Sequence, residues 1–260
     1  MIIVSAVLVN WPRNDFLASR SPSNLSRVMI LSVVVPIYNE EECLPELRRR
    51  LALVLDELGA SPARPCEIVF VDDGSTDRSR SLLEKIAAED SRVRPQFLPT
   101  NRGQFQALMR GLQVASGQYV ITLDADLQNP PEEIPAVLSA LERGHDLVMT
   151  ERVDRQDSLF RRQASRLSNW LARRIVGAPV RDHGCMLRGY SRSLADSMCV
   201  DPRGFRFITA LALFHARNPT QFHVAHAPRR QGRTCYSVVR LVRYQVDAAV
   251  SFARLRRLRS

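Results

Sequence analysis

The chain has 260 residues, and 45% of them are hydrophobic, which excludes an intrinsically disordered protein. Residues 1–151 hold 15 basic and 21 acidic residues (net −6), whereas residues 152–260 hold 22 basic and 6 acidic residues (net +16). A strongly basic second part favours a partner that carries phosphate, either a nucleic acid, an anionic membrane or a phosphate compound. No apolar run approaches the roughly 20 residues of a membrane-spanning helix.

From residue 31 onward, short apolar strands alternate with longer helical stretches. The strand candidates are rich in valine, isoleucine and leucine and lie at 31–35, 67–71, 93–97, 118–123 and 146–150. The helical stretches between them lie at 41–58, 77–89, 103–116 and 131–143. Strands that are apolar throughout are typical of a sheet covered on both faces, and this alternation indicates an α/β fold with a mostly parallel central sheet.

The alternation fades after the fifth strand, where arginine-rich helical sequence follows, with short strands expected near 185–190 and 221–227. We therefore predict one domain over residues 29–235. Its first part, 29–151, holds the regular alternation, and its second part, 152–235, is expected to build the acceptor side of the site.

The two ends of the chain differ from this domain. Residues 1–28 are mostly polar and irregular and are predicted to be a flexible N-terminal extension. Residues 236–260 combine a rough apolar face with many arginines, as in a basic amphipathic helix. Such a helix either lies on a membrane surface or docks on the domain, and the sequence leaves both interpretations open.

Polar motifs follow three of the predicted strands at the point where each strand ends. They are PIYNE at 36–40, DDGSTD at 72–77 and DAD at 124–126. In open α/β sheets, ligands bind at the carboxyl ends of the strands. The three motifs are therefore expected to share one site.

Asp124 and Asp126 flank a single residue directly after an apolar strand. Two carboxylates at this spacing can converge on a hard cation. The expected cation is Mg²⁺ or Mn²⁺, which is bound by carboxylates together with substrate phosphates. A strand-end turn or a helix cap is the alternative interpretation of the same two residues.

Asp72, Asp73 and Gly74 can form a tight turn that presents carboxylates to a ribose hydroxyl or a uracil N–H. Ser75 or Asp77 can equally cap the helix that follows. Capping accounts for Asp77 more readily than for the two preceding aspartates.

The order VVVPIYNEEE, VDDGSTDRS, NRGQFQA and ITLDADLQNPPEEIP resembles the family 2 glycosyltransferases of the GT-A fold. More narrowly, the chain resembles those that transfer a sugar from a nucleotide to a polyisoprenyl phosphate, as dolichyl-phosphate mannose synthase does. Two further stretches, RQDSLFRRQAS at 155–165 and DHGCMLRGYSR at 182–192, are similar to the bacterial undecaprenyl-phosphate 4-deoxy-4-formamido-L-arabinose transferases. The resemblance covers about residues 30–260.

The resemblance implies roles for individual residues. Asp124 and Asp126 would bind the metal and the diphosphate, and Gln128 would lie at the sugar end. The residues that would line the nucleotide pocket or open the third helix beside it are Pro36, Tyr38, Glu40, Asp72, Asp73, Asn101 and Gly103. Gly103 alternatively serves only as a turn glycine.

Asp182 matches the carboxylate position discussed as a base in the family, and Arg188 matches the arginine six residues further on. A phosphate monoester has a second pKa of about 6 and is mostly ionised at neutral pH, so its oxygen is already a nucleophile. A strong general base is therefore less necessary than for a hydroxyl acceptor. Asp182 either acts as the base or orients an arginine or the sugar.

The acceptor phosphate requires cations, and arginine binds phosphate oxygens in a bidentate manner. The candidates are Arg152, Arg155, Arg229 and Arg233. The family has a basic-x-x-Gly-x-Ser-Lys-Tyr stretch near the last two, but Thr234 and Cys235 replace its Ser-Lys pair here. For any single arginine, a solvated helix face is the alternative.

The resemblance thus implies an inverting enzyme that transfers 4-deoxy-4-formamido-L-arabinose from UDP to undecaprenyl phosphate, in lipid A modification and resistance to cationic peptides such as polymyxin. It further implies a peripheral location on the cytoplasmic face of the bacterial inner membrane, with a membrane-spanning partner or self-association as further options. Transfer of glucose, mannose or another sugar is the first alternative, and a non-catalytic remnant is the second. Nucleic-acid binding is not expected, because no recognised motif accompanies the positive charge.

Overall fold

The computed structural model of the chain describes residues 30–61, 65–152, 185–224 and 238–259. The predicted extension at 1–28 lies outside these ranges.

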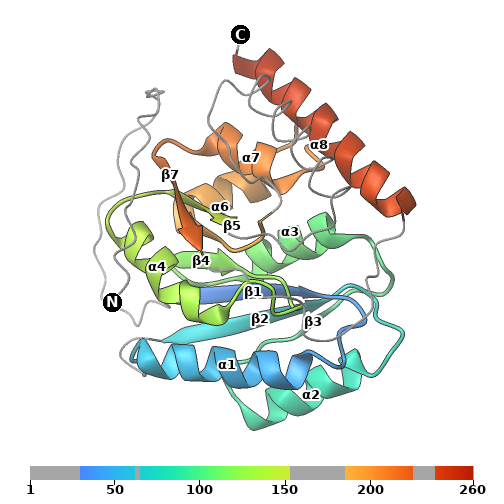
Figure 1. Cartoon of the computed structure of the whole chain (residues 1–260), viewed down its shortest axis with the longest axis vertical. Coiled ribbons are helices and arrows are strands. Elements are labelled where there is room, and N and C mark those ends of the chain that lie inside the picture. Colours follow the sequence, from blue (N-terminus) through green and yellow to red (C-terminus); the bar gives the residue numbers. More distant parts are fainter. Residues whose placement is uncertain (1–29, 62–64, 153–184, 225–237, 260) are drawn as a thin grey trace.

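Within the described residues, a seven-stranded sheet forms the centre of the molecule (Figure 1). Its strands are β1 (Leu31–Ile37), β2 (Cys66–Asp72), β3 (Gln96–Phe97), β4 (Tyr119–Thr122), β5 (Leu147–Arg152), β6 (Arg188–Ser191) and β7 (Pro219–Val224). Their order across the sheet is β3-β2-β1-β4-β6-β5-β7.

The expected mostly parallel sheet is confirmed. β1 pairs in parallel with β2 and β4, β2 with β3, and β5 with β7. β6 is the exception, because it lies between β4 and β5 and runs antiparallel to both. The sequence pattern indicated a strand near 185–190 but gave neither its direction nor its place in the sheet.

Helices cover both faces of the sheet, as its apolar strands require. They are α1 (Leu44–Glu57), α2 (Ser79–Glu89), α3 (Gln104–Val114), the 3-10 turn η1 (Pro131–Glu133), α4 (Ile134–Glu142), α6 (Arg192–Cys199), α7 (Ile208–His215) and α8 (Val238–Arg259). Buried residues of α1, α2 and α4 pack on one face, and those of α3, α6, α7 and α8 pack on the other.

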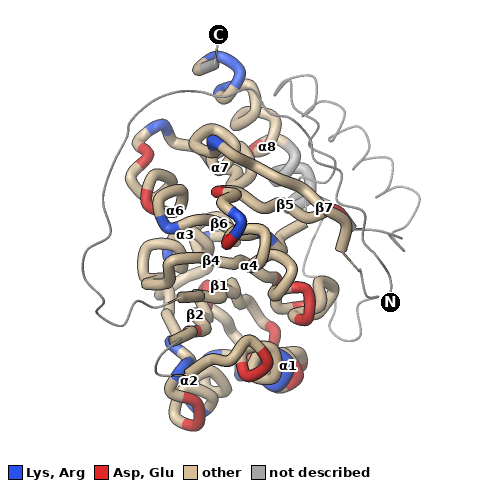
Figure 2. The backbone as a smooth tube through the Cα atoms, turned by 90° about the vertical axis from the view of Figure 1, so that its left-hand side faces the viewer, with Lys and Arg blue, Asp and Glu red and all other residues tan. Residues whose placement is uncertain are grey.

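α8 docks on the domain along one side. Phe252 and Leu255 are buried in the core, and the Phe252 ring meets the Phe207 ring edge-on, with 5.5 Å between the centroids. On its other side, Val246 and Val250 are each 54% exposed. Basic residues lie at the C-terminal end of this helix (Figure 2). In the described part of the chain, no helix has both the length and the apolar character to cross a bilayer.

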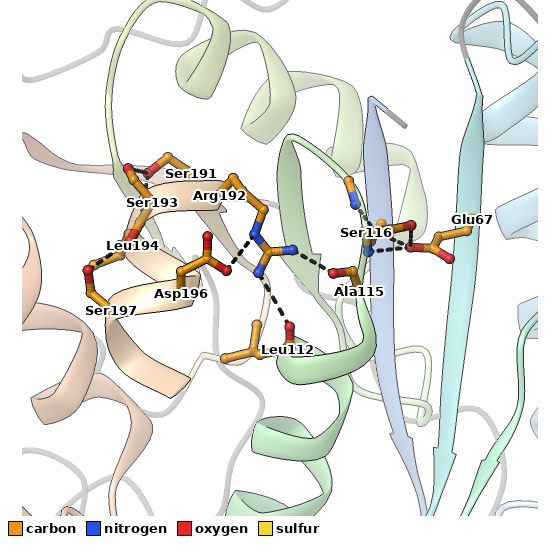
Figure 3. Close-up of polar contacts among 12 residues, drawn as sticks. Glu67, Leu112, Ala115, Ser116, Ser191, Arg192, Ser193, Leu194, Asp196 and Ser197 are labelled. Atoms are coloured by element: carbon orange, nitrogen blue, oxygen red, sulfur yellow. Dashed lines mark hydrogen bonds and ion pairs between the residues drawn. The ribbon is translucent and has the colours of Figure 1, made fainter. Parts of the chain in front are cut away.

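A buried carboxylate joins the elements at the amino ends of the parallel strands (Figure 3). Glu67 Oε1 accepts hydrogen bonds from Ser32 Oγ at 2.6 Å and from the Ser116 amide and hydroxyl at 2.7 Å each. Its Oε2 accepts from Arg94 Nη1 at 2.7 Å. Burial by itself raises the pKa of Glu67, but these hydrogen bonds outweigh burial and lower the pKa below its ordinary value of 4.5.

A second contact at this edge holds the C-terminal end of α3 (Figure 3). The Arg192 guanidinium donates through Nη1 to the Ala115 carbonyl at 2.6 Å and pairs through Nε with Asp196 at 3.0 Å. A cation at a helix C-terminus satisfies terminal carbonyls and complements the negative end of the helix dipole. The end of α3 is thereby joined to β6 and α6.

We expect Glu67→Gln to lower the free energy of unfolding by about 2 kcal/mol at neutral pH, because an amide donor replaces the oxygen that accepts from Arg94. Urea denaturation measures the change. Glu57→Gln, at an exposed position in α1, is the matched control and should change stability by less than about 0.5 kcal/mol.

The stability difference between wild type and Glu67→Gln should depend on pH in a defined direction. A carboxyl whose pKa is lower in the folded chain stabilises it at pH values above the unfolded pKa, and this stabilisation is lost as the pH falls through the folded pKa. The stability difference between wild type and Glu67→Gln should therefore be largest above about pH 5 and shrink in more acidic buffer. A difference that grows on acidification would contradict the structural role of this carboxylate.

Candidate active site

The predicted polar motifs lie in the loops that follow β1, β2 and β4, where these neighbouring parallel strands end. Pro36 lies within β1 beside Val71 of β2, and Ile37 pairs with Asp72 at the last position of the register. Tyr38 and Glu40 are half-buried in the loop that follows. The sheet therefore brings the first two motifs to the same edge.

Hydrogen bonds join the loop after β1 to the loop after β2. The Asn39 amide donates to Ser75 Oγ at 3.0 Å, and Asn39 Oδ1 accepts from the Thr76 amide at 2.8 Å. The Glu40 amide donates to Ser79 Oγ at 3.0 Å. Asn39 has a φ of 56°, in the left-handed region that asparagine tolerates better than most residues. The two loops are thus built as one unit.

Asp77 has a structural role beside the start of α2, although the N-cap residue of that helix is Arg78 and not, as the capping interpretation predicted, Asp77. Its Oδ1 accepts from the Ser79 amide at the start of α2 at 2.9 Å, and its Oδ2 accepts from the Glu41 amide at 3.2 Å. The Glu41 carboxylate in turn accepts from Arg78 Nε at 3.1 Å. The hydrogen bonds from Arg78 lower the pKa of Glu41.

Asp73 is buried and anchors the beginning of α3. Its Oδ1 accepts from the Arg102 amide at 2.7 Å, and its Oδ2 accepts from the Gly103 amide at 2.8 Å. α3 has no side-chain cap of its own, so a carboxylate from the end of β2 supplies acceptors at this terminus. Sequence reasoning assigned Asp73 to the nucleotide pocket and did not foresee this contact, which joins residues about 30 positions apart.

Two glycines in these loops have positive φ angles, and the first also lies at a close approach between loops. Gly74 has a φ of +69°, and a Cβ at this position would lie 2.7 Å from the Asn101 nitrogen. Gly103 has a φ of +92° and precedes the first residue of α3. Both positions therefore require glycine for backbone reasons, while Asn101 itself is exposed.

Asp124 and Asp126 follow the end of β4, and both are half-buried. Gln104, the first residue of α3, donates through Nε2 to Asp124 Oδ1 at 2.7 Å. Asp126 Oδ1 accepts from the Gln128 amide at 3.1 Å across Leu127, which has a φ of 59° and a buried side chain. Each carboxylate therefore accepts a hydrogen bond from the protein.

This pair fits the divalent cation that the motif predicted. Among the described residues, no three His, Cys, Asp or Glu side chains form a cluster that could enclose a metal. Mg²⁺ does not need such a cluster, since one or two carboxylates, water and substrate phosphates complete its octahedron. Asp124 and Asp126 offer this incomplete set of hard oxygen donors, which suits a metal that is bound together with a phosphate compound.

A buried polar cluster supports the loop after Asp126. The Cys185 thiol lies 3.4 Å from Asn129 Oδ1 and 3.0 Å from Thr150 Oγ1, and Thr150 donates to the Leu187 carbonyl at 2.7 Å. All four described cysteines, Cys185 included, are free thiols. The cluster ties the loop after β4 to the end of β5 and to the residues before β6.

Arg188 lies at the start of β6, level with Thr122 of β4 and Met149 of β5, and is only 1% exposed. Since Thr122 is the last residue of β4, Arg188 lies beside the end of that strand. Arg152 is the last residue of β5. The remaining predicted site residues, Asp182, Arg155, Arg229 and Arg233, lie outside the described residues.

Sequence reasoning missed three residues that hold this edge together: Asn39, Gln104 and Asn129. Each lies inside a recognised motif, but its partner belongs to another motif or another strand. The NRGQFQA motif pointed to the right loop, yet only Asn101 and Gly103 were assigned a role in it.

The chain is similar to two curated bacterial relatives, each named undecaprenyl-phosphate 4-deoxy-4-formamido-L-arabinose transferase. It is 47% identical to the relative from Pseudomonas fluorescens and 45% identical to that from Salmonella paratyphi B, in both cases over 218 residues, or 84% of this chain. The matched region is 63% and 65%, respectively, of the lengths of these relatives.

Solved structures share the fold at low sequence identity. Glucosyl-3-phosphoglycerate synthase from Mycobacterium tuberculosis, in complex with Mn²⁺, UDP-glucose and phosphoglyceric acid, has a TM-score of 0.62 and 19% identity. That match covers 88% of this chain and 80% of the synthase. The same synthase in complex with Mg²⁺ and UDP has a TM-score of 0.61, with 87% of this chain and 79% of the synthase covered. These likenesses confirm the expected GT-A fold.

The family model described as "Glycosyl transferase family 2" matches residues 32–198. This segment begins in β1, contains all three strand-end motifs and reaches into α6, so it includes the site described above. The chain therefore belongs to glycosyl transferase family 2.

Proposed function

We propose that the chain transfers 4-deoxy-4-formamido-L-arabinose from UDP to undecaprenyl phosphate, with inversion at the anomeric carbon. The observation that carries this proposal is the identity of 45–47% with relatives that bear this name. The proposal concerns the activity of the whole protein, and this chain matches 63–65% of the length of those relatives, which is less than two thirds.

The donor site that we propose uses the joined loops after β1 and β2. Asp72 is almost fully buried and accepts from the Ser75 amide at 3.1 Å, so its carboxylate is held at the end of β2. With Pro36, Tyr38, Glu40 and Asp73, it would line the nucleotide pocket, beside Asn101 and Gly103. UDP in the structural relatives supports a uridine nucleotide as the donor.

Asp124 and Asp126 would hold Mg²⁺ or Mn²⁺, the two ions present in those structural relatives. When bound, the cation supplies charge stabilisation for the departing diphosphate. The protein's own contribution is to fix both carboxylates in advance, through Gln104 and the Gln128 amide. Gln128 would lie at the sugar end of this site.

The acceptor needs positioning more than deprotonation. A phosphate monoester at neutral pH already carries a nucleophilic oxygen, which would attack the anomeric carbon on the side opposite the leaving diphosphate. Arg188 is a buried cation at the end of the sheet that holds the site, and it would offset negative charge there. Arg152, Arg155, Arg229 and Arg233 are the further proposed contacts to the acceptor phosphate, and Asp182 would act as base or orient the reactants.

We further propose that α8 lies on an anionic membrane surface through the side that faces away from the domain. Val246 and Val250 are one turn apart and exposed, and Arg256 and Arg257 are exposed in the last turns, whereas Arg254 donates to the Arg203 carbonyl of the domain. Arginines near an anionic leaflet contribute about 1 kcal/mol each. A peripheral place on the cytoplasmic face of the inner membrane would bring the site to its lipid acceptor, in the modification of lipid A.

We expect Asp126→Asn to reduce UDP release that depends on undecaprenyl phosphate by at least about 100-fold, because the charge that binds the cation is lost. Asparagine keeps an oxygen that can accept from the Gln128 amide, so the fold should be preserved. Asp56→Asn, at an exposed position in α1, is the matched control and should retain activity.

The assay also separates the alternatives. A panel of UDP-sugars and other nucleotide sugars, each with and without Mg²⁺ or Mn²⁺, identifies the donor. If a nucleotide-linked glucose or mannose is turned over faster than the formamido sugar donor, that sugar is the substrate in place of the proposed one. Absence of turnover with every donor, in a folded wild-type protein that still binds UDP, would favour a non-catalytic remnant.

The membrane side of α8 is tested by Val250→Glu. This change should weaken binding to vesicles that contain anionic lipid by about 10-fold, since it removes apolar contact and adds a repelled charge. Leu53→Glu makes the same charge change at a 50% exposed position of α1, which covers the other face of the sheet. Equal vesicle binding by the two variants would contradict the membrane role of α8.

A further inference from the structure

We propose that Gln104 is a positioning residue that sets the orientation of the Asp124 carboxylate and so tunes the affinity for the divalent cation. This inference rests on the proposed function, in which Asp124 and Asp126 hold that cation.

The geometry joins two strand ends, those of β2 and β4, through the start of α3. Asp73, after β2, accepts from the Arg102 and Gly103 amides and so fixes where α3 begins. Gln104 is the next residue, and its Nε2 donates to Asp124 Oδ1 at 2.7 Å, a short bond for an amide and a carboxylate. The side chain that reaches Asp124 therefore starts from an anchored backbone rather than from a free loop.

A neutral amide is well suited to this contact. A lysine or arginine at the same distance would pair with the carboxylate and compete with a cation, and a glutamate would repel it. The glutamine amide holds one carboxylate oxygen without bringing a positive charge that would compete with the cation. Asp126 Oδ1 accepts in a comparable way from the Gln128 backbone amide, so each carboxylate accepts from at least one neutral donor.

The effect of such a positioning residue on metal affinity has a known magnitude. Partners that hydrogen-bond to metal ligands typically change metal affinity by about 10–100-fold when they are mutated, because the ligand must then be ordered at the moment of binding. Gln104 itself would not touch the cation. Its loss should therefore weaken cation binding without abolishing it, unlike the loss of Asp126.

The test compares Gln104→Leu with Gln106→Leu. Both changes replace a glutamine of α3 by a residue of similar size, but Gln106 is exposed. Isothermal titration of Mn²⁺ into protein saturated with UDP should show a dissociation constant about 10-fold higher for Gln104→Leu than for wild type. Gln106→Leu should bind Mn²⁺ like wild type, and the urea midpoints of both variants should confirm that they are folded.

Gln104→Asn is the second variant, because it keeps the amide and its polarity but is one methylene too short to reach Asp124. It should weaken Mn²⁺ binding as Gln104→Leu does, and it remains informative if the leucine variant does not fold. In an Asp124→Asn background, Gln104→Leu should have less than about a twofold further effect, because contacting residues act non-additively. Turnover at saturating Mn²⁺ should recover more in Gln104→Leu than in Asp124→Asn.

The outcomes distinguish the two levels of the proposal. If wild-type protein with UDP binds no Mn²⁺ or Mg²⁺, the proposed metal-dependent function fails. If wild type binds the cation, and Gln104→Leu and Gln104→Asn bind it equally well, the inference about Gln104 fails while the function stands. A full effect of Gln104→Leu in the Asp124→Asn background would likewise overturn it, since Gln104 would then act through another group.

Discussion

The contact on which the site depends is the one between the Asp73 carboxylate and the Arg102 and Gly103 amides. A buried carboxylate is costly unless it is hydrogen-bonded, and the start of a helix has amides that need acceptors, so each group resolves the requirement of the other. Because Asp73 directly follows β2, these hydrogen bonds fix the position of the start of α3 relative to the sheet. The position of Gln104, and through it the Asp124 carboxylate after β4, follows from the same contact.

α3 is held at its other end by a complementary interaction. Arg192 donates to the Ala115 carbonyl just beyond the helix, so an anion acts at the N-terminal side and a cation at the C-terminal side, as the helix dipole favours. Glu67 secures the neighbouring Ser116 and the amino ends of β1 and β2 at the same edge. The edge opposite the site is thus closed by buried polar contacts, which leaves the loops at the carboxyl ends to carry the chemistry.

Local sequence predicted the parts of the structure that depend on local pattern. Apolar runs identified β1, β2 and β4, and their polar ends identified the site, because parallel strands necessarily end at one edge. β6 was only indicated as a strand near 185–190, since its antiparallel place between β4 and β5 depends on pairing with strands tens of residues earlier in the chain. Gln104 and Asn129 were missed for the same reason, as their partners Asp124 and Cys185 are 20 and 56 residues away.

The two interpretations of the C-terminal helix are compatible rather than exclusive. Phe252 and Leu255 bury one side of α8 against the domain, whereas Val246 and Val250 remain exposed on another. Removing the helix would therefore expose part of the hydrophobic core and would also remove the proposed membrane contact. Only substitutions on the outer side of α8 separate its packing role from its membrane role. Acidic residues at the strand ends suit a cation and a diphosphate, while Arg256 and Arg257 near the end of α8 are exposed, where a surface of opposite charge can meet them.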